Sequence, residues 1–180
     1  MDAFFASVEQ LDEPLLRQRP VAVTNGMRGT CIITCSYEAR ARGIYTGMRI
    51  KEAQQLCPQI VQRPARPQRY AELATRMSDA LRDEISPDLE IFSVDEAFLD
   101  VSHCQKLLGS PESIGAQTKA VINAAIDLPC TVGVAGDKTT AKFIAKEHKP
   151  DGIGILPPWQ ARQRLHDVPV SKLCGIGEGI

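Results

Sequence analysis

The chain has 180 residues, a formal net charge of -1 and a pI near 6.3, so one large domain or two small ones are expected. Its 43% hydrophobic and 24% charged residues are typical of a protein with an ordinary core. No apolar run is long enough to span a bilayer, and the N-terminus lacks the basic segment of a signal peptide, so we expect a cytoplasmic protein with no membrane partner. The near-neutral charge argues against a strongly basic nucleic-acid binder, so any such surface must be local or lie outside this chain.

The cysteines predict neither a zinc site nor a disulfide. No pair has the C-x-x-C spacing that is typical of zinc sites. Two of them fall four residues apart in an apparent strand, where about 13 Å separates such residues, too far for a disulfide. We expect buried thiols at Cys31, Cys35, Cys57, Cys104, Cys130 and Cys174.

The first third of the chain predicts short helices and a hairpin. The helices are expected over residues 3–10, 37–43 and 48–56. The hairpin is expected from strands over residues 21–24 and 30–36, joined by a turn in which Gly26 suits a positive φ. Asp2 is placed to cap the first helix. The polar, proline-rich run 62–69 predicts a domain boundary.

The remainder predicts an α+β fold. An amphipathic helix over residues 70–85 precedes a hairpin over 89–101. After it we expect helix, strand, helix, strand and helix, over residues 110–128, 131–135, 138–148, 153–156 and 157–168. With a strand at the extreme N-terminus, this order fits a ferredoxin-like, mixed and mainly antiparallel sheet with helices on one face. The hairpin would lie at the centre of that sheet.

Two adjacent carboxylates interrupt this hairpin. Asp95 and Glu96 are poor residues for a two-residue turn, which favours Asn-Gly, Asp-Gly or Gly-X. At the bend their side chains can converge, but two like charges held close repel unless a cation lies between them. The residues alone leave two interpretations open about equally: a solvated hairpin tip with two surface acids, or a divalent-metal site.

Two further places have both a structural and a functional interpretation. Phe4 and Phe5 cannot face the same side of a helix, because successive residues turn by about 100°. One can pack in the core while the other faces a cleft, although two core residues are the commoner case. Tyr37 and Arg40 lie at a strand-to-helix junction, where an arginine can hold phosphate oxygens. On these residues alone a solvated helix face is favoured.

Four motifs occur together in one order: Asp2-Ala-Phe-Phe-Ala-Ser-Val-Glu9, Tyr37-Glu-Ala-Arg40, Ser93-Val-Asp-Glu-Ala-Phe-Leu-Asp100 and Lys149-Pro-Asp-Gly152. In this order they closely resemble the Y-family, or translesion, DNA polymerases of the DNA polymerase IV type, over essentially the whole chain. The resemblance implies template-directed transfer of a nucleotide from a dNTP to a primer 3′-OH. It also implies a palm, small inserted fingers and the beginning of a helical thumb, over residues 1–3 with 67–156, over 4–66 and over 157–180.

The same resemblance implies roles for individual residues. Asp95 and Glu96 would be the catalytic acids and would bind two Mg²⁺ ions, or Mn²⁺ in their place, with the Met1 backbone carbonyl as a further metal ligand. Phe5 would be the steric gate that excludes a ribose 2′-OH, beside Phe4 in the nucleotide site. The other nucleotide contacts would be Thr34, Tyr37, Arg40 and Lys149. A thumb hairpin would hold a DNA phosphate at Gly175 and Gly177.

One departure from the family pattern matters. Family members carry an Asp immediately before the pair that here is Met1-Asp2, and that Asp is a metal ligand; Asp2 matches the next aspartate, which is not. Most of the thumb and the little-finger domain are also missing, and the sliding clamp is expected to bind through that C-terminal region. We expect primer–template DNA and dNTP as partners, but little polymerase activity from these 180 residues alone. Primer extension by them at normal rates would contradict this.

Two other functions stay open. The first is a catalytically deficient scaffold in the DNA damage response. The retained Asp95 and Glu96 favour the enzyme, whereas the missing first Asp favours the scaffold. The second is a nucleotide cyclase with a similar palm and two-metal chemistry. It does not explain the Phe4-Phe5 helix together with the Tyr37-Glu-Ala-Arg40 motif.

Overall fold

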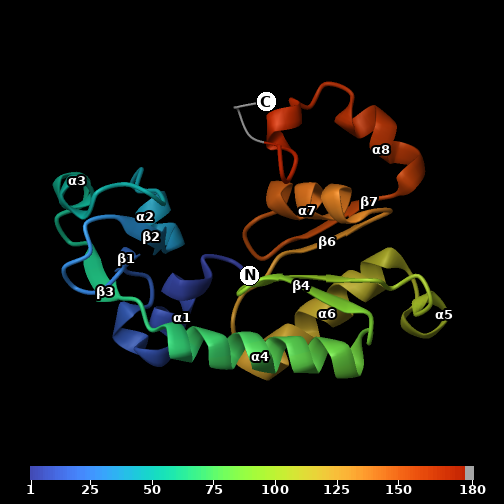
Figure 1. Ribbon diagram of the computed structural model, residues 1–180, viewed down its shortest axis with the longest axis horizontal. Coiled ribbons are helices and arrows are strands. Elements are labelled where there is room, and N and C mark those ends of the chain that lie inside the picture. The colour runs from blue at the N-terminus through green and yellow to red at the C-terminus, as the bar shows by residue number, and fades with distance from the viewer. Residues whose placement is uncertain (177–180) are drawn as a thin grey trace. The chain divides into compact units, whose positions relative to one another are not determined.

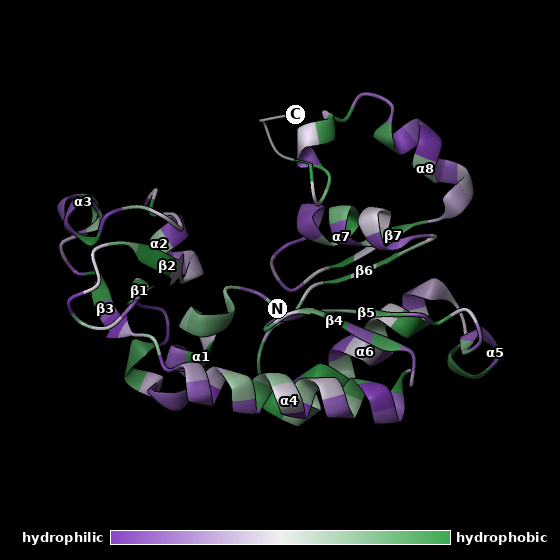
Figure 2. Ribbon diagram, in the orientation of Figure 1, coloured by the Kyte–Doolittle hydropathy of each residue, from purple (hydrophilic) through white to green (hydrophobic). Residues whose placement is uncertain are grey.

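The structure is a computed structural model and describes residues 1–176 (Figure 1). The chain forms two compact units: Met1 with Ala3–Thr75, and Asp2 with the residues from Arg76 onward. The division falls within the helix α4 (Pro67–Glu84), in which hydrophobic and hydrophilic residues alternate (Figure 2). Both units combine helices with small sheets, which confirms the predicted α+β class.

The first unit contains a three-stranded sheet in the order β2-β1-β3. The hairpin of β1 (Val21–Thr24) and β2 (Ile32–Cys35) is antiparallel, as predicted. The third strand, β3 (Val61–Pro64), pairs in parallel with β1 and overlaps the run 62–69 that we expected to be a boundary. Pairing with the fully buried β1 holds residues 62–64 of this polar run as an edge strand, where a terminal proline is tolerated, and the domain boundary within the run stays a prediction.

Helices cover this sheet and complete the core of the unit. They are α1 (Phe4–Asp12), α2 (Tyr37–Arg40) and α3 (Ile50–Leu56), with a 3₁₀ turn at Pro14–Leu16. Buried apolar side chains from β1, β2, α2 and α3 pack into one cluster. Ser36 caps α2, because its hydroxyl accepts the Ala39 amide. Asp2 does not cap α1 as we expected, because left-handed Ala3 occupies the cap position and the Asp2 carboxylate is bonded elsewhere.

As far as residue 176, the second unit contains four strands and four complete helices. Its strands are β4 (Leu89–Ser93), β5 (Glu96–Leu99), β6 (Val132–Ala135) and β7 (Ile153–Leu156). Its helices are α5 (Gln105–Leu108), α6 (Pro111–Ile126), α7 (Lys138–Glu147) and α8 (Pro158–Leu165), and a 3₁₀ turn follows at Val170–Lys172. The predicted acidic hairpin is present as the antiparallel pair β4–β5.

The strands of this unit pair differently from the single sheet that we expected. Within residues 1–176, β4–β5 is one antiparallel pair and β6–β7 is a separate parallel pair. The parallel pairing follows from the connection, since α7 returns the chain to the same end of the sheet. We expected the acidic hairpin at the centre of one sheet, but within the described residues its strands form no backbone ladder with β6 or β7.

Helices cover both faces of the β6–β7 pair, whereas we expected helices on one face. A side chain at Gly133 or Gly154 would collide with α7, because a Cβ atom there would lie 2.0 Å from the Ala141 carbonyl oxygen or 2.7 Å from the Ile144 carbonyl oxygen. The neighbouring residue Ile153 points the other way and contacts Gly115 of α6. Glycine on one face thus allows α7 to approach closely.

The cysteines are all free thiols, as predicted, but only some are buried. Cys35, Cys57 and Cys130 are buried, while Cys31 is exposed, so the expectation of six buried thiols was wrong. Cys31 lies at the end of the turn between β1 and β2, just before the buried residue Ile32. Within the described part of the chain, no helix is long and apolar enough to cross a membrane.

Asp137 caps α7 and gives a pH-dependent prediction. Its carboxylate accepts the Thr140 amide at 2.8 Å and the Thr140 hydroxyl at 2.7 Å, and these bonds hold the pKa of Asp137 below its ordinary value. A lowered folded-state pKa adds stability at neutral pH that is lost as the pH falls through that pKa. We expect Asp137→Ala to lower the free energy of unfolding by about 1 kcal/mol at pH 7. Urea denaturation should show a smaller difference from wild type at about pH 3; an equal difference at both pH values would contradict this.

Candidate active site

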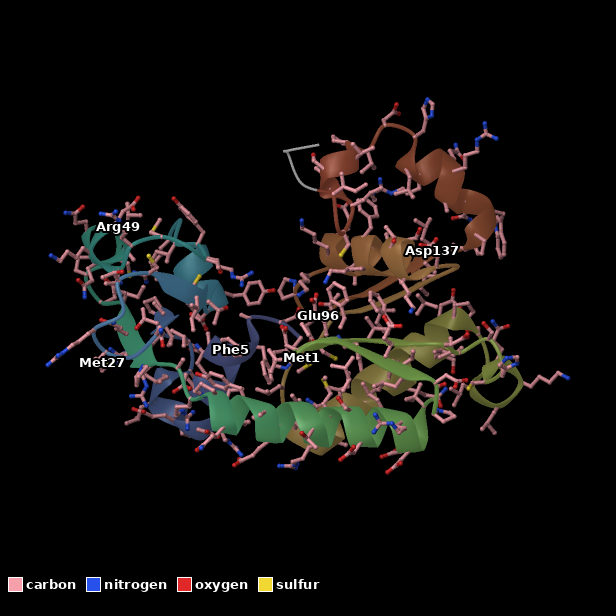
Figure 3. The ribbon with its side chains drawn as sticks, viewed as in Figure 1. Met1, Phe5, Met27, Arg49, Glu96 and Asp137 are labelled. Atoms are coloured by element: carbon pink, nitrogen blue, oxygen red, sulfur yellow. The ribbon has the colours of Figure 1, made fainter. Side chains whose placement is uncertain are left out.

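The acidic hairpin brings its two carboxylates to one point. Asp95 lies in the turn and Glu96 begins β5, where it pairs with Ser93 across an irregularity in the register of β4 (Figure 3). Such a bulge changes the direction in which neighbouring side chains point. The Ser93 hydroxyl lies 3.1 Å from Asp95 Oδ1 and 3.3 Å from Glu96 Oε2, within donating distance of both. The predicted convergence of the two acids is therefore present in this unit.

A lysine from α7 supplies positive charge beside these acids. Lys142 Nζ lies 2.5 Å from Glu96 Oε1 and 4.3 Å from the centre of the Phe92 ring. Burial raises the pKa of Glu96, but the hydrogen bond and charge of Lys142 outweigh it, so the pKa of Glu96 is below its ordinary value. The carboxylate is therefore ionised at neutral pH. Sequence analysis did not identify Lys142 as a site residue. The pattern that could have indicated it is the lysine at every fourth position of α7.

A second cluster in the same unit surrounds the predicted nucleotide contact Lys149. The Asp2 carboxylate is fully buried and lies 3.6 Å from Lys149 Nζ. It also accepts the Thr131 hydroxyl at 3.1 and 2.9 Å and the Asp151 backbone N–H at 2.8 Å. Asp2 thus ties the Lys149-Pro-Asp-Gly152 motif to the start of β6. We expected Asp2 at a helix cap, and its actual partners lie 129 to 149 residues away in the sequence.

The two phenylalanines of α1 belong to the first unit and differ in burial. Phe4 is buried and Phe5 is partly exposed, in accord with their different directions on the helix. The Phe5 ring stacks on the ring of Tyr70, with centroids 4.2 Å apart and an angle of 12° between the planes. Tyr70 was expected only as a helix residue, so sequence analysis missed this contact.

Three other predicted nucleotide contacts lie together in the first unit. Thr34 is in β2, and Tyr37 and Arg40 are the ends of α2. The Arg40 guanidinium lies 4.9 Å from the centre of the Tyr37 ring, and its Nε donates to the Cys35 carbonyl at 3.3 Å. Most of the guanidinium N–H donors remain for another acceptor. Tyr37 and Arg40 therefore contact each other at the strand-to-helix junction, and Thr34 lies in the adjoining strand.

The remaining predicted residues have fewer described contacts. Met1 is buried, and Gly175 is exposed with a φ of 83°, a conformation that favours glycine. Gly177 lies outside the described residues. Among residues 1–176 there is no group of three or more His, Cys, Asp or Glu side chains that could hold a metal. The structure gives the positions of the two acids within the second unit and of the junction residues within the first unit. A cleft shared by these two groups stays a prediction.

Comparison with known sequences places the chain in a family. A sequence model of the impB/mucB/samB family matches residues 1–146, so the chain belongs to this family. It is 40% identical to DNA polymerase IV 2 of Mesorhizobium japonicum over 177 residues, which is 98% of this chain and 41% of the relative. It is also 40% identical to DNA polymerase IV of Alkalilimnicola ehrlichii over 179 residues, 99% of this chain and 50% of the relative. The chain thus spans half or less of the length of these relatives.

Solved structures agree with the sequence relatives. A structure described as a Dbh ternary complex matches with a TM-score of 0.89 and 32% identity, covering 99% of this chain and 52% of that one. A Y-family DNA polymerase chimera of Dbh and Dpo4 matches with a TM-score of 0.87 and 33% identity, covering 98% and 52%. These matches confirm the resemblance to Y-family polymerases and the fold class.

Proposed function

We propose that this chain is the catalytic part of a translesion DNA polymerase, which transfers a nucleotide from a dNTP to a primer 3′-OH on a DNA template. The observation that carries the proposal is the convergence of Asp95 and Glu96 on the Ser93 hydroxyl beside Lys142. This arrangement occurs in a chain that is 40% identical to DNA polymerase IV relatives. We further propose the palm, fingers and thumb over the residue ranges given above.

The two acids fit a magnesium site. Mg²⁺ prefers hard oxygen ligands and commonly uses carboxylates together with substrate phosphates and water, so Asp95 and Glu96 are suitable ligands beside the further family Asp that these 180 residues lack. In the proposal Asp95 and Glu96 hold the metals, with the Met1 carbonyl as a further ligand, and Mn²⁺ can replace Mg²⁺. When bound, two such ions activate the primer hydroxyl and stabilise the charge on the attacking and leaving oxygens. Lys142 keeps the Glu96 carboxylate ionised and oriented.

The proposed nucleotide site uses cations and one aromatic ring. Arg40 and Lys149 would bind triphosphate oxygens and offset the charge that develops on the leaving pyrophosphate. Thr34 and Tyr37 would contact the same nucleotide, and Phe5 would lie against its sugar beside Phe4. Gly175 and Gly177 would bind a DNA phosphate, and a sliding clamp would bind outside this chain. We propose the cytoplasm as the location.

Primer extension tests the proposal. The assay compares residues 1–180 alone with an extended version, in which they are joined at both ends to the flanking segments of the Alkalilimnicola ehrlichii polymerase. With Mg²⁺ or Mn²⁺ and dNTPs, we expect the extended version to copy the template and residues 1–180 alone to be far slower. An extended version that binds primer–template DNA but adds no nucleotide would contradict the polymerase and support the scaffold.

A substitution at Phe5 tests the proposed sugar contact. In the extended version, Phe5→Ala should raise incorporation of ribonucleotides relative to deoxyribonucleotides by roughly 10- to 200-fold, the range for one small group that a pocket accepts or rejects. The measurement is kcat/KM for dCTP and CTP opposite a template guanine. Phe143→Leu, a change of a buried core ring in α7, is the matched control and should leave the ratio near that of wild type. An unchanged ratio in Phe5→Ala would contradict the role of Phe5.

A further inference from the structure

Phe5 and Glu9 lie one turn apart on the same side of α1. Residues at positions i and i+4 of a helix are neighbours on its surface. Both reach Tyr70 of α4: the Phe5 ring stacks on the Tyr70 ring, and the Glu9 carboxylate accepts the Tyr70 hydroxyl at 2.8 Å. Tyr70 therefore joins a partly exposed ring, at the proposed sugar contact, to a buried charge.

The Glu9 carboxylate is fixed by arginines of the same unit. Glu9 is 1% exposed, and its Oε1 accepts Arg66 Nε at 2.9 Å, while Oε2 lies 3.5 Å from Arg63 Nε. Each arginine is itself held by a second acid, because Arg66 pairs with Asp12 at 2.9 Å and Arg63 with Glu13 at 2.8 Å. A buried carboxylate held on both oxygens cannot move without breaking these contacts. Glu9 is thus a fixed acceptor.

The Tyr70 ring has little freedom while this acceptor is in place. Tyr70 is 2% exposed, and its ring also packs at 6.2 Å from that of Phe4. A buried phenol needs a hydrogen-bond partner, so the hydroxyl end of the ring is anchored at Glu9. Burial, and then the bond to Glu9, raises the pKa of Tyr70, so its hydroxyl stays a donor over the working pH range. The anchored ring forms a flat support under Phe5.

We propose that Glu9 is a positioning residue for sugar selection: it anchors the Tyr70 hydroxyl, and the anchored Tyr70 ring sets the position of the Phe5 ring against the incoming sugar. This inference rests on the proposed role of Phe5 in nucleotide binding. It assigns a function to a buried charge of the first unit.

The test measures sugar selection in the extended version with three substitutions. Tyr70→Phe keeps the stacked ring and removes only the hydroxyl, and Glu9→Leu removes the acceptor at similar volume. Each should lower the ratio of kcat/KM for dCTP over CTP by about fivefold to tenfold, an effect of the size of one typical net hydrogen bond. The double substitution should lower it no further, because both act through one contact. Glu9→Gln keeps an acceptor oxygen and should retain most of the selection.

A matched control separates positioning from general support. Glu72→Gln weakens an exposed ion pair within α4, between Glu72 and Arg69, which lies outside the contacts that hold Glu9. This variant should keep the wild-type ratio, and primer extension with dNTPs should continue in Tyr70→Phe. Normal extension with an unchanged dCTP/CTP ratio in Tyr70→Phe would overturn the inference while leaving the polymerase intact. No extension by the unsubstituted protein would instead refute the proposed function.

Discussion

Replacing Asp95 by alanine should reduce primer extension by the extended version about a hundredfold to a thousandfold, the order expected when a group that stabilises transition-state charge is lost. Asp95 and Glu96 supply the two carboxylates that converge on Ser93, and the proposed metals depend on both. Removing one leaves a single acid that already pairs with Lys142. The measurement is the single-turnover rate of nucleotide addition at saturating dNTP and Mg²⁺.

A nearby acid provides the control for this experiment. Glu90 lies on β4 of the same hairpin and pairs with Lys138 of α7, as Glu96 pairs with Lys142, but it is away from the turn. Glu90→Ala should therefore change the rate by less than about threefold, since an exposed ion pair contributes little. Equal rates in Asp95→Ala and wild type would refute the metal site; equal losses in Asp95→Ala and Glu90→Ala would show a general effect on the hairpin.

The second large effect is on stability, and it comes from Asp2. Asp2→Ala should lower the free energy of unfolding by about 3 kcal/mol, because it leaves the partners of a buried carboxylate without an acceptor. These partners are the Thr131 hydroxyl, the Asp151 N–H and the Lys149 ammonium. Urea denaturation of residues 1–180, monitored by circular dichroism, measures the loss of unfolding free energy.

Two milder substitutions calibrate this result. Asp2→Asn keeps one acceptor oxygen, and Thr131→Val removes a single donor, so each should cost about 1 kcal/mol. The loss of unfolding free energy should therefore be largest in Asp2→Ala and smaller in Asp2→Asn and Thr131→Val. A loss in Asp2→Ala no larger than in Thr131→Val would mean that Asp2 does not hold the Lys149 motif in place.

Local patterns in the sequence predicted most of the elements correctly. The i, i+4 spacing of Leu73, Met77 and Leu81 predicted the buried side of α4, and all three are buried. Two apolar runs around Asp95 and Glu96 predicted the hairpin and the convergence of its acids. These features depend on residues that are close in the chain, so periodicity and turn chemistry suffice to find them.

The features that were missed depend on contacts between distant residues. The strand β3 is polar and ends in Pro64, and only its pairing with β1 holds it in a sheet. Lys142 lies 46 residues after its partner Glu96, and Tyr70 lies 61 residues after Glu9. Asp2 was predicted to cap a helix because it directly precedes one in the sequence. Its actual partner, the Asp151 backbone N–H, is too far along the chain to be found from spacing alone. Such contacts require the topology of the fold, which single-sequence patterns do not contain.

The most direct test is to locate the metal. We propose crystals of the extended version with primer–template DNA, a non-hydrolysable dNTP and Mn²⁺, with data collected at the manganese absorption edge. We predict an anomalous peak at ligand distance from the carboxylates of both Asp95 and Glu96, next to the triphosphate. Nucleotide bound in the crystal with manganese away from both acids would contradict the proposed active site.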